Sequence, residues 1–130
     1  MTKRGASDLG ERKLFPARPT VYKGIQMRSR LEARWAAELD AWGVEWLYEP
    51  RAYADENGQY LPDFEVHNEG KTFFVEVKPT ETAAEAAPSR IAPLFSSLPK
   101  ALVWVIWPIA GPDEWGTFFV WRDRVARFAP

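Results

Sequence analysis

The feature that most constrains the fold is an uninterrupted apolar run, ALVWVIW, at residues 101–107. A strand that alternates apolar and polar residues has one face in water, whereas a continuous run predicts burial of both faces. The run is also much shorter than the roughly 20 residues that a helix needs to cross a bilayer. We therefore expect an interior strand of a sheet that is covered on both faces.

The elements around this strand are predicted from periodicity and from turn residues. A helix is expected over residues 28–42, with Ser29 as its N-cap and Gly43 just after its end. Its apolar residues recur at helical spacing: Leu31, Trp35, Leu39 and Trp42. Propensity and alternation predict further strands at residues 44–49, 60–66, 72–78 and 117–121.

Residues 80–98 are rich in alanine and glutamate and are expected to be helical, with Pro88 and Pro93 breaking them into short pieces. The resulting order, α-β-β-β-α-β-β, predicts an α/β fold with a central mixed sheet flanked by helices. The length of 130 residues suits one domain. We assign residues 1–19 to a flexible basic arm and residues 20–130 to a single domain.

Charge is distributed unevenly along the chain, although the net charge is only −1. Residues 1–35 contain nine basic and three acidic side chains, and residues 36–130 contain eight and fifteen. This asymmetry between a basic arm and an acidic body needs an explanation, and a solvated basic tail is the plainest one. The chain has no cysteine and a single histidine, His67, so a metal site has to use oxygen ligands.

The hairpin at residues 60–78 carries the most informative pattern. Its apolar faces fix the pairing register, because a one-residue slip would send one set to the opposite side of the sheet. That register places Asp63, Glu76 and Lys78 on the other side, with Asp63 opposite Glu76 or one diagonal away. The apolar residues that fix it are Phe64, Val66, Phe73, Val75 and Val77. Two adjacent carboxylates raise each other's pKa, and a divalent cation such as Mg²⁺ relieves their repulsion.

A third acid comes from the predicted helix. On a helical projection Glu32 borders the buried stripe, so its side chain can point toward the sheet and reach the acidic patch. Ordinary roles stay open for each residue alone. Lys78 can form a salt bridge with Asp63 or Glu76, and Glu32 can act only as a capping-box acid.

Other residues of interest have plainer interpretations. Glu49 is read as a charge at a strand edge, with a further acid of the site as the alternative, and His67 is read as a turn residue. The aromatic residues near the two C-terminal strands are expected to serve as core, with a possible dimer contact, rather than as base-stacking platforms. They include Trp104, Trp107, Trp115 and Trp121.

The acids and the lysine of the hairpin resemble the PD-(D/E)xK nuclease motif. Pro62 and Asp63 match its PD, and Glu76, Val77 and Lys78 match its ExK, thirteen residues after the aspartate. In addition, RSRLE at residues 28–32 resembles the helix that carries an extra acid in this superfamily. The resemblance covers about residues 21–107 and points to small members, such as phage-type junction-resolving endonucleases and the amino-terminal nuclease domain of the TnsA transposase subunit.

The resemblance implies a restriction-endonuclease-like αβββαβ core and a Mg²⁺-dependent DNA endonuclease, acting on branched, phage or transposon DNA intermediates, with Mn²⁺ able to substitute. Asp63 and Glu76, with the Val77 carbonyl, would hold one Mg²⁺, and Glu32 would help hold that ion or a second. Lys78 would orient or deprotonate the attacking water. The alternative is a catalytically silent nuclease-fold subunit that binds DNA or a protein.

Basic side chains before and within the predicted helix are the expected DNA contacts. Pairing with phosphates beside the acidic centre is salt-sensitive and independent of sequence. The candidates are Lys23, Arg28, Arg30 and Arg34. Solvated helix charges are the alternative for Arg30 and Arg34.

The expected assembly and location follow from analogy and composition. A homodimer, or a partner subunit of a DNA-processing complex, is expected because cutting both strands is simplest with two centres related by symmetry. The polar start of the chain does not resemble a signal peptide, and no membrane partner is expected. Frequent alanine and arginine favour a bacterial or phage protein that works in the cytoplasm of a bacterial or infected host cell.

Overall fold

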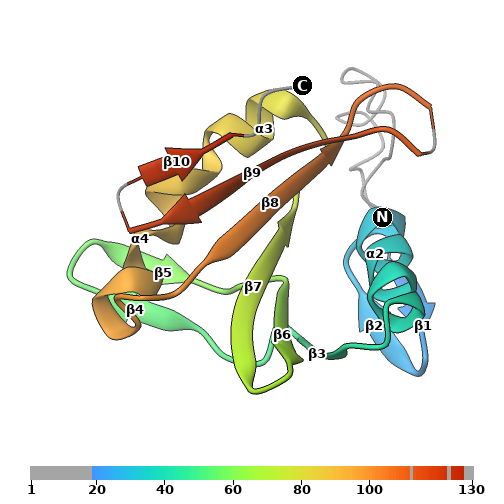
Figure 1. Cartoon of the computed structure of the whole chain (residues 1–130), viewed down its shortest axis with the longest axis horizontal. Coiled ribbons are helices and arrows are strands. Elements are labelled where there is room, and N and C mark those ends of the chain that lie inside the picture. The colour runs from blue at the N-terminus through green and yellow to red at the C-terminus, as the bar shows by residue number, and fades with distance from the viewer. Residues whose placement is uncertain (1–18, 112, 123, 128–130) are drawn as a thin grey trace, which may run out of the picture.

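The computed structural model describes residues 19–111, 113–122 and 124–127, so nearly all of the predicted basic arm lies outside the described residues. Its largest sheet has six strands: β3 (Glu45–Tyr48), β6 (Phe64–Asn68), β7 (Lys71–Val77), β8 (Val103–Pro108), β9 (Trp115–Trp121) and β10 (Arg124–Ala126). Their spatial order is β10-β9-β8-β7-β6-β3 (Figure 1). The β7–β8 pair is parallel and the other neighbouring pairs are antiparallel, so the sheet is mixed, as predicted.

Helices cover both faces of this sheet. Helix α2 (Arg30–Ala41) lies on one face with the hairpin β1 (Thr20–Tyr22) and β2 (Ile25–Met27) beside it (Figure 1). The other face carries α3 (Glu81–Glu85), α4 (Ala87–Ser97) and a second hairpin, β4 (Tyr53–Asp55) and β5 (Gly58–Tyr60). The predicted α/β architecture is therefore confirmed. Among the described residues, no helix combines the length and the apolar character that crossing a membrane requires.

Strand β8 separates two apolar cores, as its continuous apolar sequence predicts. Val103 and Val105 pack with α4 residues Ile91 and Leu94 on one face, whereas Ile106 packs on the other. The core beneath α2 consists mainly of Met27, Leu31, Trp35, Leu39, Phe64, Val66, Val75 and Val77. Burial on both faces anchors β7 and β8, and the end of β7 is where the acidic residues gather.

One predicted strand is placed wrongly. The strand expected over residues 60–66 is interrupted: Tyr60 ends β5 in a separate two-stranded sheet, and β6 begins only at Phe64. Pro62 lies in the connection, where its missing N–H removes no ladder hydrogen bond. As a result, Tyr60 folds back beneath the main sheet, with its side chain buried in the core on the α4 face.

The prolines do not break residues 80–98 as predicted. The interruption falls between Glu85 and Ala87, and α4 then runs to Ser97 through Pro93. Pro88 lies in the first turn of α4, where a helix needs no N–H donor. Pro93 is tolerated because packing of the buried face of α4 outweighs the lost helical hydrogen bond.

The aromatic residues are only partly core. Trp107 is buried, and Trp104 and Trp115 are half-buried against the core beneath α2, as expected. Trp121 is exposed at the end of β9, which contradicts a core position. Trp42, expected in the buried stripe of the helix, is instead its exposed C-cap and stacks on Trp104.

Candidate metal centre

The predicted site residues line one cavity of about 320 Å³, at the end of the sheet where β7 finishes and α2 starts. Four carboxylates and two basic side chains line it, so it is acidic overall. The lining residues are Arg28, Ser29, Leu31, Glu32, Glu49, Leu61, Asp63, Glu76, Val77, Lys78 and Pro79. The structure thus brings together Glu32, Asp63, Glu76, Val77 and Lys78, which the sequence analysis had selected from separate segments.

The hairpin places Asp63 and Glu76 as its register predicts. Phe64 pairs with Val75 at the start of the β6–β7 ladder, and the next position sets Asp63 opposite Glu76. Both side chains are buried. One Asp63 oxygen, Oδ2, accepts a hydrogen bond from the backbone N–H of Val77 at 2.8 Å, which fixes the carboxylate against the neighbouring strand.

Glu32 reaches the cavity from the first turn of α2. Ser29 caps the helix by accepting a hydrogen bond from the Glu32 N–H at 3.1 Å, as predicted. Glu32 Oε1 in turn accepts from the N–H of Arg28 at 3.0 Å and from the Tyr48 hydroxyl at 2.9 Å. Glu32 therefore satisfies the Arg28 backbone donor before the helix and also lines the acidic cavity.

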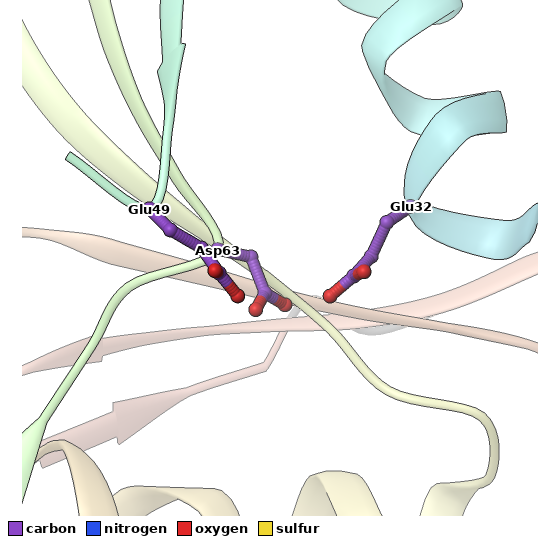
Figure 2. A group of neighbouring side chains, drawn as sticks. All are labelled: Glu32, Glu49 and Asp63. Carbon is purple, nitrogen blue, oxygen red and sulfur yellow. The ribbon is translucent and has the colours of Figure 1, made fainter. Parts of the chain in front are cut away.

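Glu49 joins the cluster from the residue after β3. Its N–H donates to the Asp63 carbonyl at 2.9 Å, one position beyond the β3–β6 ladder, and its φ of 46° lies in the left-handed region. Oxygens of Glu32, Glu49 and Asp63 lie within 4.8 Å of one another, and Figure 2 shows the three side chains converging. Glu49, read from the sequence as a strand-edge charge, instead lies with the acids of the cavity.

Glu76 lies beside this group and is held by other partners. Its Oε1 accepts a hydrogen bond from the Tyr60 hydroxyl at 2.6 Å, and its Oε2 lies 3.1 Å from Lys78 Nζ. The salt bridge considered for Lys78 is therefore made with Glu76. The pair anchors the ammonium group at the cavity, where the Lys78 side chain is largely buried.

The surroundings of the cavity disfavour the ionised form of two of its carboxyl groups, those of Asp63 and Glu49. Burial raises the pKa of Asp63 well above its usual range, and the charges of Glu76 and Glu32 raise it further. The Val77 N–H and Lys78 act in the opposite direction. Burial also raises the pKa of Glu49, and the charge of Arg28 opposes this effect.

The donor set fits a hard divalent cation. Carboxylate oxygens at this spacing are the ligands that Mg²⁺ and Mn²⁺ prefer, and a cation offsets the repulsion among the buried acids. Glu32, Glu49 and Asp63 form the closest oxygen cluster, and Glu76 adjoins it.

The predicted DNA-binding residues are placed differently from one another. Arg28 lines the cavity and forms an ion pair with Glu49. Arg30 is exposed at the start of α2. Arg34 pairs with Asp113 and lies over the Trp115 ring. Lys23 pairs with Asp40 and does not line the cavity.

The prediction that His67 occupies a turn is wrong, because β6 continues through Asn68. Its Nε2 lies 2.8 Å from Glu65 Oε2, and its Nδ1 lies 3.0 Å from the Thr72 hydroxyl. Alternation along β6 explains the first contact, since residues 65 and 67 share one face. His67 does not line the acidic cavity.

Two residues that orient the acids were missed by the sequence analysis, Tyr48 and Tyr60. Tyr48 had a usable signal, because its strand was predicted. Tyr60 had none, since its contact depends on the separate β4–β5 hairpin.

In comparisons with known proteins, no family model and no curated sequence matches this chain significantly.

Proposed function

We propose that this protein is a Mg²⁺-dependent DNA endonuclease of the PD-(D/E)xK type, with a restriction-endonuclease-like core. The observation that carries the proposal is the convergence of Asp63, Glu76 and Lys78 with Glu32 in one cavity. Structural salt bridges alone do not require this arrangement, because acids outnumber bases there and Asp63 is destabilised as an ion. If the separate β4–β5 hairpin is set aside, the order of helix α2, three strands of the main sheet (β3, β6 and β7), helices α3 and α4 and the parallel strand β8 supports the proposed core.

The residues of the cavity have separable roles in this proposal. A bound divalent cation supplies Lewis acidity and a water of lowered pKa. Asp63 and Glu76, with Glu32 and Glu49 beside them, hold the cation through carboxylate oxygens, and the Val77 carbonyl is a further ligand implied by the motif. Lys78 is held in place by its ion pair with Glu76, and it orients the attacking water and stabilises charge on the phosphate.

Location and assembly are also proposed. We place the activity in the cytoplasm of a bacterial or phage-infected cell, which the composition supports. We propose a homodimer, or a subunit of a DNA-processing complex, because the described chain has one such cavity and duplex cleavage requires two strand cuts.

Incubation of the whole chain with supercoiled, linear, single-stranded and branched DNA tests the proposal. We expect cleavage with Mg²⁺ or Mn²⁺ and none with EDTA. Lys78→Ala is expected to reduce the rate by a factor on the order of 10²–10⁴, the usual contribution of a positioned proton-transfer group. Lys71→Ala, at an exposed position of the same strand, is the matched control and should cleave normally.

Absence of cation-dependent product from every substrate would show that the protein is not a nuclease. If salt-sensitive DNA binding persisted in that case, the catalytically silent binding subunit would be the better description.

A further inference from the structure

Arg28 connects the acidic cavity with the surface. Its N–H donates to Glu32 Oε1 and to the Tyr48 hydroxyl, both at 3.0 Å, so its backbone is fixed at the cavity. Its Nε lies 2.8 Å from Glu49 Oε2. The Arg28 side chain is nevertheless 69% exposed, whereas that of Glu49 is 18% exposed. A guanidinium group is therefore held at the rim by an acid that belongs to the cavity.

The Glu49 carboxylate has two competing positive partners when a cation is bound. It pairs with Arg28 on its outer side, and its oxygens lie within 4.8 Å of those of Glu32 and Asp63 on its inner side. The backbone of Glu49 is tied to the Asp63 carbonyl, so the side chain stays at this junction. An ion pair with one exposed partner is weak, and a divalent cation is the stronger partner for the carboxylate.

We propose that Arg28 is a DNA-phosphate contact that Glu49 restrains until a divalent cation binds. The inference rests on the proposed nuclease function. Once Glu49 shares its charge with the cation, the Arg28 guanidinium is free to pair with a backbone phosphate, in the bidentate geometry that arginine favours. The cation and DNA then bind cooperatively, and by linkage each raises the affinity for the other. DNA therefore binds preferentially to protein that already holds the divalent cation.

Replacing Glu49 with a neutral side chain should release Arg28, as cation binding is proposed to do. Binding of the whole chain to a short fluorescent duplex is measured by anisotropy, in EDTA and in Ca²⁺. The duplex is examined afterwards to confirm that it was not cleaved. In EDTA we expect E49Q to bind DNA about three- to tenfold more tightly than wild type. Its log–log salt dependence should steepen by about 0.9, the value for one added phosphate contact. Ca²⁺ should strengthen binding by wild type much more than by E49Q.

Two variants separate release of Arg28 from a general change in charge. Asp40→Asn removes the same charge from a similar exposed pair, Lys23–Asp40, which is 2.9 Å long and lies outside the cavity. We expect D40N to change DNA affinity less than E49Q does. The double variant E49Q/R28A should lose the gain and bind like R28A. Thermal melts confirm that each variant is folded.

The inference is overturned if E49Q in EDTA binds DNA no more tightly than D40N, or if the gain persists without Arg28. Cleavage by wild type in Mg²⁺ is scored in parallel. If wild type cleaves DNA and E49Q shows no gain, only the restraint of Arg28 fails. If wild type neither binds nor cleaves DNA, the nuclease function fails together with this inference.

Discussion

Tyrosine hydroxyls orient two carboxylates of the cavity. Tyr48 donates to Glu32 at 2.9 Å and Tyr60 donates to Glu76 at 2.6 Å. Burial and the neighbouring Glu76 charge raise the pKa of Tyr60 well above its usual range, so its hydroxyl stays a neutral donor. If the proposed cation binds here, such hydrogen-bond partners restrict the orientation of its ligands beforehand, which lowers the entropy lost on binding.

Removing one of these hydroxyls should weaken cation binding. We expect Tyr60→Phe to reduce Mn²⁺ affinity by a factor on the order of 10, a typical effect of losing a hydrogen bond to a metal ligand. Isothermal titration calorimetry measures the change. Tyr22→Phe is the matched control, because the Tyr22 hydroxyl also bonds a carboxylate at 2.6 Å, that of Asp40, outside the cavity. Equal affinities in Tyr60→Phe and wild type would refute an orienting role for Tyr60.

At the scale of elements, the site depends on where strands and helices begin and end. Helix α2 packs on one face of the sheet, and alternation assigns Asp63 and Glu76 to the other. The acids meet Glu32 only because β7 ends, β6 begins and α2 starts at the same end of the sheet. The N-cap of α2 therefore contributes to the site as well as to the stability of the helix.

Loss of the α2 cap should affect both stability and cation binding. Ser29→Ala is expected to lower the free energy of unfolding by about 1 kcal/mol, the usual value of a lost N-cap. It should also weaken Mn²⁺ binding, since Glu32 lies in the first turn. Thr80→Ala removes the equivalent cap of α3, where Thr80 accepts from the Ala83 N–H at 3.1 Å. Urea denaturation and calorimetry should show a stability loss in both variants and weaker Mn²⁺ binding in Ser29→Ala alone.

The local pattern of apolar and polar residues was sufficient to predict much of this end of the sheet. Alternation along the hairpin gave the register of Asp63 and Glu76, and helical spacing gave the direction of Glu32. Glu49 was read as a strand-edge charge because its place depends on a left-handed φ and on a bond to the Asp63 carbonyl, neither of which has a sequence signature. Tyr60 was assigned to the wrong strand because Pro62 separates two elements that share one alternation.

At the scale of the whole molecule, buried acids make stability depend on pH. A carboxyl group with a higher pKa in the folded than in the unfolded chain stabilises the fold fully at low pH, and this contribution is lost as the pH rises through the folded pKa. Asp63 is such a group. Asp40 acts in the opposite direction, because hydrogen bonds from Tyr22, Lys23 and Trp46 lower its pKa to about 2. Its stabilising contribution is therefore lost as the pH falls toward that value.

Comparison of wild type with Asp63→Asn isolates the contribution of Asp63. Without a cation, we expect the variant to be more stable than wild type at neutral pH. The difference should shrink as the pH falls toward about 4, the value for an unfolded aspartate. Mg²⁺ should stabilise wild type increasingly with pH, because binding requires the ionised carboxylate, and should stabilise the variant little. Thermal unfolding in EDTA and in Mg²⁺ across this range is the measurement. A variant no more stable than wild type at neutral pH would contradict a strained acidic cluster.

The pairing of Asp63 with Glu76 is set by position on a shared ladder, and the number of residues between them is incidental. The connection at Glu69 and Gly70 lies at the far end of that ladder. Insertions there would leave the two acids opposed, whereas one extra residue within a single strand would turn its acid toward the face beneath α2. Over evolutionary time the interval between the acids is therefore free to lengthen or shorten while the chemistry is kept. Homologues of this protein are better recognised by paired strand positions than by a fixed spacing.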